Sequence, residues 1–216
     1  MAHYKVRPLE RLRALGVVGP RLIAVHSVHV TEPELDLLAA FGCAVAHCPS
    51  SNLKLASGFA PVASMLARSI NVGLGTDGAA SNNRLDLLQE MRTAALLAKA
   101  VSGNPEALPA YQALRAATIN GARALGIDAV TGSIEPGKAA DLCAISITGP
   151  QLAPQYGVMS QLVYAAGREN VSHVWVAGRL LIDERAYTGI DLTDLDKRAG
   201  LWQNKLARET RPETRP

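Results

Sequence analysis

The segment with the clearest chemical potential covers residues 71–83 and reads NVGLGTDGAASNN. Its apolar start predicts a short strand, which runs through a glycine and a threonine to one carboxylate, Asp77. A long helical pattern begins near Leu85. A strand, an acidic residue, a loop rich in Gly and Asn, and a helix are the parts by which an α/β barrel presents a catalytic residue at the carboxyl end of a strand. An aspartate in this place can also serve as a turn or helix-cap residue, so the interpretation needs further support.

Two earlier apolar runs each end in a histidine. Residues 21–25 (RLIAV) lead to His26, and residues 43–46 (CAVA) lead to His47. Helical patterns separate the three strands: residues 33–41 and 62–68. Such alternation implies parallel strands joined by right-handed crossovers, with their carboxyl ends on one rim. We therefore expect His26, His47 and Asp77 to converge there, where they could bind a metal or move protons.

Composition narrows the class of protein. Of 216 residues, 48% are hydrophobic and 19% are charged, which favours a buried α/β core over disorder. The net charge of +3 is small and the arginines are scattered, so neither a nucleic acid nor a membrane is an expected partner. Three cysteines without a CxxC pair favour a reducing compartment, the first residues carry no apolar signal segment, and no apolar run could span a bilayer. The expected location is cytoplasmic.

The remaining patterns divide the chain into three parts. Residues 1–126 contain the strands above, an entry helix at about 7–15 and two later helices at about 85–101 and 109–125. Residues 127–190 form a small β module, with a strand at 142–147 and a hairpin at 171–182. Residues 191–216 form a terminal helix, to about residue 207, and a charged, Pro-containing tail that is expected to fray.

Four motifs connect the chain to a known family. They read AVHSVH from residue 24, HCPSSNLKLASG from residue 47, VGLGTDGAASNN from residue 72 and GSIEPGKAAD from residue 132. With them the chain resembles the carboxyl-terminal part of the amidohydrolase superfamily, in the branch of methylthioadenosine/S-adenosylhomocysteine deaminases and triazine hydrolases. The resemblance implies the carboxyl-terminal portion of a metal-dependent (β/α)8 TIM barrel, strands 6 to 8, plus part of a flanking β-sandwich. Residues 51–58 favour the adenosine-type deaminases, with guanine deaminase and the triazine chlorohydrolases as alternatives.

The resemblance also implies roles for individual residues. Asp77, at the end of strand 8, would be a ligand of one Zn²⁺ or Fe²⁺ and would accept the proton of the attacking water. His26, at the end of strand 6, would stabilise the charge that develops in the transition state. We expect His47 to support the loop 50–52 rather than to bind the metal. Structural or surface roles are expected for four further residues: His3, His29, Cys48 and His173. The resemblance assigns no substrate-binding residue, and the expected substrate is a small aminated heterocycle.

The chain also departs from the family pattern. It contains no His-x-His pair, and it lacks the metal-binding His and the general acid/base Glu that strand 5 would supply. A catalytic zinc needs three or more protein ligands, whereas the chain offers Asp77 and at best His26. A barrel cannot close with three strands, so open edges are expected. Three hypotheses follow: a deaminase fragment that is inactive alone, a subunit completed by a separate amino-terminal half-barrel, and a non-catalytic module that forms a homo-oligomer through its open edge.

Overall fold

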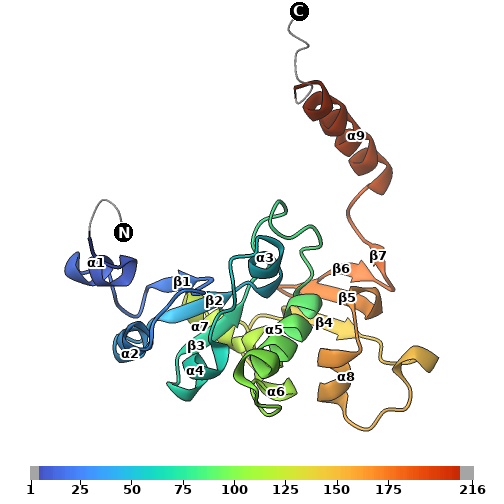
Figure 1. Ribbon diagram of the computed structural model, residues 1–216. Coiled ribbons are helices and arrows are strands. Elements are labelled where there is room, and N and C mark those ends of the chain that lie inside the picture. Colours follow the sequence, from blue (N-terminus) through green and yellow to red (C-terminus); the bar gives the residue numbers. More distant parts are fainter. Residues whose placement is uncertain (1–4, 210–216) are drawn as a thin grey trace, which may run out of the picture.

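The structure is a computed structural model that describes residues 5–209, and these residues contain two separate sheets (Figure 1). The first sheet is parallel, with three strands in the order β1-β2-β3. Its strands are β1 (Ile23–Val25), β2 (Ala44–His47) and β3 (Asn71–Leu74). They are short apolar runs, as is typical of parallel strands that are covered on both faces. Both outer strands, β1 and β3, have an edge without a partner strand among the described residues.

One helix precedes β1 in the chain, and further helices follow each of the three strands. Their bounds are α1 (Pro8–Ala14), α2 (Glu32–Ala40), α3 (Pro49–Lys54), α4 (Val62–Ala67), α5 (Leu87–Ser102), α6 (Ala110–Ala116) and α7 (Ile119–Leu125). Thr31 and Glu34 form a capping box at the start of α2, in which the backbone N–H of Thr31 donates to the Glu34 carboxylate at 2.9 Å. Glu34 also accepts from the Arg7 guanidinium at 2.7 and 2.8 Å, which ties the residue before α1 to α2.

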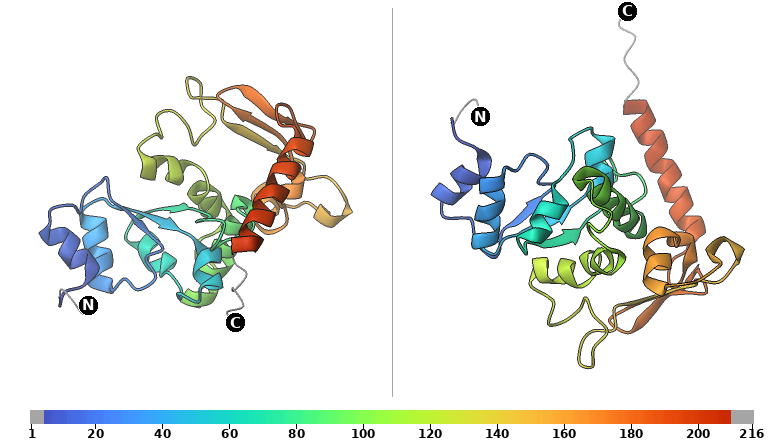
Figure 2. Two further views of the ribbon diagram at one scale, coloured as in Figure 1. Left: turned by 90° about the horizontal axis from the view of Figure 1, so that it is seen from above. Right: turned by 60° about the horizontal axis from the view of Figure 1, so that its bottom comes forward.

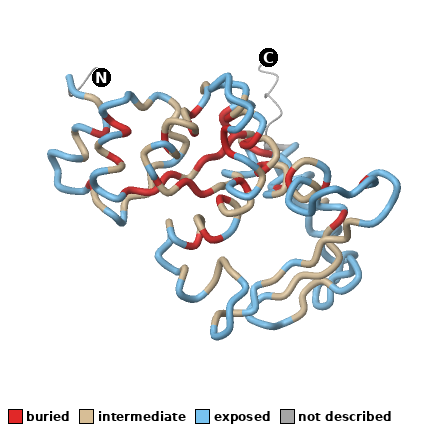
Figure 3. The backbone as a smooth tube through the Cα atoms, turned by 90° about the horizontal axis from the view of Figure 1, so that it is seen from below, coloured by how far each residue is buried: buried red, intermediate tan, exposed pale blue. Residues whose placement is uncertain are grey.

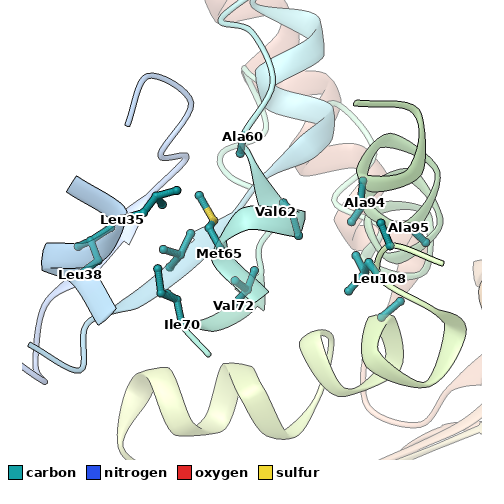
Figure 4. Packing of buried hydrophobic residues seen from close by; sticks show 14 of the residues in the cluster. Leu35, Leu38, Ala60, Val62, Met65, Ile70, Val72, Ala94, Ala95 and Leu108 are labelled. Carbon is teal, nitrogen blue, oxygen red and sulfur yellow. The ribbon is translucent and has the colours of Figure 1, made fainter. Parts of the chain in front are cut away.

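An aliphatic core joins the parallel sheet to its helices (Figure 4). Leu35, Leu38 and Met65 come from α2 and α4 and are fully buried, together with Val72 of β3. Burial of each such large side chain contributes about 1.5–3 kcal/mol relative to exposure. The buried residues gather along the parallel sheet and its helices, whereas the later part of the chain is mostly intermediate or exposed (Figure 3).

The second sheet is antiparallel and lies beside the first part of the chain (Figures 1 and 2). Its strands are β4 (Leu142–Ile145), β5 (Val171–Val176), β6 (Arg179–Asp183) and β7 (Ala186–Tyr187). Further helical elements are η1 (Pro150–Leu152), α8 (Val158–Tyr164), η2 (Arg168–Asn170) and α9 (Leu192–Glu209). Val163 of α8 is buried in the main core, and Arg92 of α5 donates to the Ala166 carbonyl at 2.7 Å, so α8 attaches this module to α5. The helix α9 extends away from both sheets (Figure 1).

Several local expectations need correction. The segment 50–52, expected as a loop, lies in the short helix α3, which Pro49 begins with its preset φ. The helix expected at 109–125 is two helices, because Thr118 between them has φ −130° and ψ −101°. Asp86 caps α5 by accepting from the Gln89 N–H at 3.1 Å, so α5 begins at Leu87. Between the predicted strand at 142–147 and the hairpin at 171–182, where no helix was expected, the chain forms α8.

Some expectations concern parts of the chain that the structure does not test. The division at residues 126 and 190 stays a prediction. The expected fraying of the tail and the role of His3 lie outside residues 5–209. Within that range, no helix combines the length and the apolar character needed to cross a bilayer.

Candidate active site at the carboxyl ends of the parallel strands

The parallel register brings the three strand ends to one edge of the sheet. The backbone N–H of His26 donates to the Ala46 carbonyl at 2.9 Å, and the N–H of Gly75 donates to the His47 carbonyl at 3.0 Å. These bonds extend the ladder one residue past β1 and β3. The chain therefore leaves all three strands at the same rim, where α/β proteins place their sites.

Asp77 is the most heavily hydrogen-bonded carboxylate of this rim. Its Oδ2 accepts from the Ser51 hydroxyl at 2.6 Å and from the Ser81 hydroxyl at 2.8 Å, and its Oδ1 accepts from the Gly78 N–H at 2.7 Å. The bonds from Ser51, Ser81 and Gly78 lower the pKa of Asp77 from 3.8 to about 2, with a smaller contribution from His26. Asp77 is thus an ionised acceptor at neutral pH.

His26 faces this carboxylate from the end of β1. Its Nε2 lies 3.8 Å from the Asp77 Oδ2, and its Nδ1 lies 2.8 Å from the Oδ1 of the buried Asn52. With the amide oxygen accepting, Nδ1 is the donor of this bond, and Nε2 is the ring nitrogen that faces Asp77. Both side chains are about one-third exposed, at 38% and 33%, so a small molecule can reach them.

The backbone is in the left-handed region at both residues. The φ values are +64° at His26, +49° at Ser27 and +60° at Asp77. For residues other than glycine this conformation costs on the order of 1 kcal/mol each, and it persists only where the surroundings fix it. Such residues cluster at functional sites, and here they aim the two side chains that follow β1 and β3.

The other histidines considered from sequence are not part of this pair of side chains. His47 is only 3% exposed, and its ring nitrogens have no hydrogen-bond partner within residues 5–209. Any support that it gives to the segment 50–52 therefore comes from packing and not from a hydrogen bond of its ring. Burial is the main reason that the pKa of His47 falls from 6.5 to about 4, and the nearby His26 lowers it further. His29 is exposed and His173 pairs with Asp183 at 3.2 Å in the β module, far along the chain from the rim.

Cys48 is buried, as expected for a packing residue. Its burial, with smaller contributions from Asp77 and Glu90, raises its pKa to about 11. The thiol is therefore neutral at pH 7 and has no nucleophilic character.

Several polar residues of the site could not be assigned roles from sequence. Ser51 and Asn52 lie within a family-like motif, but only the structure shows that they bond Asp77 and His26, respectively. The apolar pattern of α5 did not identify Glu90 as a site residue. Its side chain is nevertheless 1% exposed and accepts hydrogen bonds from Ser50 and Asn82. A charged residue on the buried face of an otherwise apolar helix is the one signal that could have identified it.

The capacity of this site for a metal is limited. Among the described residues, no group of three or more His, Cys, Asp or Glu side chains is arranged to hold an ion. Asp77 is ionised and accessible, and His26 offers one ring nitrogen beside it. These two donors suit a divalent ion only together with ligands from elsewhere, because zinc sites use three or more protein ligands.

Comparison with known proteins places the chain in a family. The model of the amidohydrolase family matches residues 2–181, and the chain belongs to this family. It is 46% identical over 206 residues to a 5-methylthioadenosine/S-adenosylhomocysteine deaminase of Saccharophagus degradans, a match that covers 95% of this chain and 46% of the relative. The chain thus spans about half the length of the curated relatives it matches.

Solved structures of relatives also match nearly all of this chain with about half of their own length. A zinc-bound adenosine deaminase from Xanthomonas campestris superposes with a TM-score of 0.94 at 49% identity, over 96% of this chain and 47% of that one. An atrazine chlorohydrolase from Arthrobacter aurescens TC1, also in complex with zinc, has a TM-score of 0.86 at 30% identity, over 92% and 44% of the two chains. The predicted fold class, the carboxyl-terminal portion of an amidohydrolase barrel with part of its β-sandwich, is confirmed.

Proposed function

We propose that the chain forms the carboxyl-terminal half of a metal-dependent hydrolase that replaces the amino group of an adenine-type nucleoside with oxygen. The observation that carries this proposal is the pair of Asp77 and His26, which two left-handed backbone turns aim at each other with Nε2 and Oδ2 3.8 Å apart. Similarity to deaminases of adenine nucleosides supports the substrate class.

In the proposed reaction, water adds to the ring carbon that carries the amino group, and the carbon–nitrogen bond then breaks. Asp77 accepts a proton from the water at its carboxylate and returns it to the departing nitrogen, which leaves as ammonia. Its three hydrogen bonds keep this carboxylate ionised before the reaction. The Nε2 of His26 hydrogen-bonds the attacking oxygen while its Nδ1 is fixed by Asn52. A bound zinc would polarise the water, with Asp77 as the ligand from this chain.

The proposed activity requires a second half of the barrel. An amino-terminal half, with strands 1 to 5 of the complete barrel, would supply the missing metal ligands. Its strands would also pair with the open edges of β1 and β3. That half could belong to the same polypeptide or to a separate one. Iron instead of zinc, and a cytoplasmic location, remain predictions from the sequence.

The alternatives receive less support. The similarity to the atrazine chlorohydrolase is 30%, against 46–49% for the deaminases, so a triazine substrate is the weaker candidate. No observation favours guanine. A non-catalytic module would need neither the ionised Asp77 nor its backbone strain.

The test combines this chain with the amino-terminal half of the Saccharophagus degradans relative, called the complementing half below. The two are co-expressed and purified with zinc, and ammonia release is measured with methylthioadenosine, adenosine, guanine and atrazine. We expect release from the adenine nucleosides and its loss in Asp77→Asn. Asp128→Asn, a change to an exposed carboxylate that lies 4.0 Å from Arg123, is the matched control and should keep full activity. A zinc-loaded complex that is inactive on every adenine nucleoside, or an Asp77→Asn complex with full activity, would contradict the proposal.

A further inference from the structure

Glu90 is the most deeply buried ionisable carboxyl group among the described residues, and no part of the proposed reaction uses it. It lies near the start of α5, the long helix that follows the Asp77 loop (Figure 1). A negative charge in the first turns of a helix is favoured by the helix dipole. Each of its two oxygens accepts a hydrogen bond from a neutral donor, and the two donors come from different segments of the chain.

The first contact reaches the segment that follows β2. The Oε2 of Glu90 accepts from the backbone N–H of Ser50 at 3.0 Å. The next residue, Ser51, donates to Asp77 at 2.6 Å, and Asn52 holds the Nδ1 of His26 at 2.8 Å. A shift of the start of α3 would therefore move the partners of both proposed catalytic side chains.

The second contact reaches the segment that follows β3. The Oε1 of Glu90 accepts from the Nδ2 of Asn82 at 2.7 Å, and the same Nδ2 donates to the Thr76 carbonyl at 2.9 Å. Thr76 directly precedes Asp77. Asn82 is 5% exposed, so water cannot readily replace these bonds.

We propose that Glu90 is a positioning residue that joins the start of α3, after β2, to the loop after β3 and thereby fixes Asp77 against His26. The role rests on the proposed function, because it concerns the geometry of that site. Two acceptor oxygens are required, since both facing groups are donors. A glutamine would offer one oxygen and one NH2 group, so one of the two loops would lose its bond and meet a donor instead.

The first experiment uses the chain alone and needs no activity. Hydrogen exchange of backbone amides is compared in the wild type and Glu90→Gln, with Ala95→Gly as a control that weakens the same buried helix without touching either loop. We expect exchange in residues 49–54 and 76–84 to be about tenfold faster in Glu90→Gln, while the control leaves these segments unchanged relative to the rest of the chain. Unchanged exchange in both segments of Glu90→Gln, or equal acceleration in the control, would overturn the proposal.

A second variant serves if Glu90→Gln does not fold. Asn82→Ala removes the contact of Glu90 toward β3, together with the bonds of Asn82 to Thr76 and Arg84, and it leaves the bond of Glu90 to Ser50 in place. Exchange should therefore accelerate in residues 76–84 and stay normal in residues 49–54. Equally faster exchange in both segments, or unchanged exchange in both, would contradict the claim that Glu90 holds the two segments through separate contacts.

Activity provides the final readout. In the complex with the complementing half, Glu90→Gln should lower kcat about tenfold or more with little change in KM, because geometry in the transition state and not substrate binding is disturbed. Ala95→Gly should keep kcat within about twofold. Equal kcat values in wild type and Glu90→Gln would overturn the positioning role. If the wild-type complex is inactive, the proposed function fails, while the exchange experiment still decides whether Glu90 joins the loops.

Discussion

The burial of His47 predicts a specific loss of stability at mildly acidic pH. Its pKa is about 4 in the folded protein, against 6.5 for an ordinary histidine, chiefly because its ring is buried. Below about pH 6.5 the unfolded chain therefore binds a proton that the folded protein does not, and the free energy of unfolding falls as the pH drops from 6.5 toward 4. Between about pH 7.5 and pH 4.5 these two pKa values correspond to a loss of about 2–3 kcal/mol.

Urea unfolding at a series of pH values measures this loss. The matched variant is His47→Gln, which keeps a polar side chain of similar length but cannot titrate. All other titrating groups are common to both proteins, so the difference between the two pH profiles isolates His47. We expect the wild type to lose about 2–3 kcal/mol more than His47→Gln over this range. Parallel profiles would refute the reasoning, because they would mean that the ring becomes protonated without unfolding.

Three further predictions concern the site and the core. Ser51→Ala should raise the pKa of Asp77 above its value of about 2, because the hydrogen bond from Ser51 is the largest cause of the low pKa. Carbon NMR titration of the Asp77 carboxyl group measures this pKa, and an unchanged pKa would disprove the role of Ser51. Asn52→Ala should free the His26 ring and lower kcat of the complemented enzyme about tenfold or more at unchanged zinc content, whereas loss of zinc would point to a structural role instead. Met65→Ala should lower the free energy of unfolding by about 2–5 kcal/mol in urea, since Met65 is fully buried in the core; a change below about 1 kcal/mol would show that the core is not packed as described.

The part of the fold that could be predicted from sequence is the part that local patterns specify. The three parallel strands are apolar runs separated by helical segments, and the strand that leads to Asp77 ends in a Gly-rich turn. The break at Thr118 was not predictable in this way. The apolar pattern continues from α6 into α7, although the backbone at Thr118 between them is not helical. The helix α3 was missed because it has only six residues and a polar sequence.

The candidate site was predictable in its residue types but not in its contacts. Strand order and direction are enough to bring His26 and Asp77 to one rim. The bond of Ser51 to Asp77 and that of His26 to Asn52 each join residues 26 positions apart, so they depend on the register of β1, β2 and β3. The left-handed backbone at His26 and Asp77 could not be predicted from the sequence either, because neither residue is a glycine.

The incompleteness of the metal site is tested by the zinc content of the chain, measured by elemental analysis together with ammonia release, first for the chain alone and then for the chain with the complementing half. We expect far less than one zinc per chain and no deamination for the chain alone, because Asp77 and His26 cannot hold the ion by themselves. For the complex we expect about one zinc and deamination of an adenine nucleoside. A chain that binds one zinc and releases ammonia without any second half would contradict the claim that it carries only part of an active site.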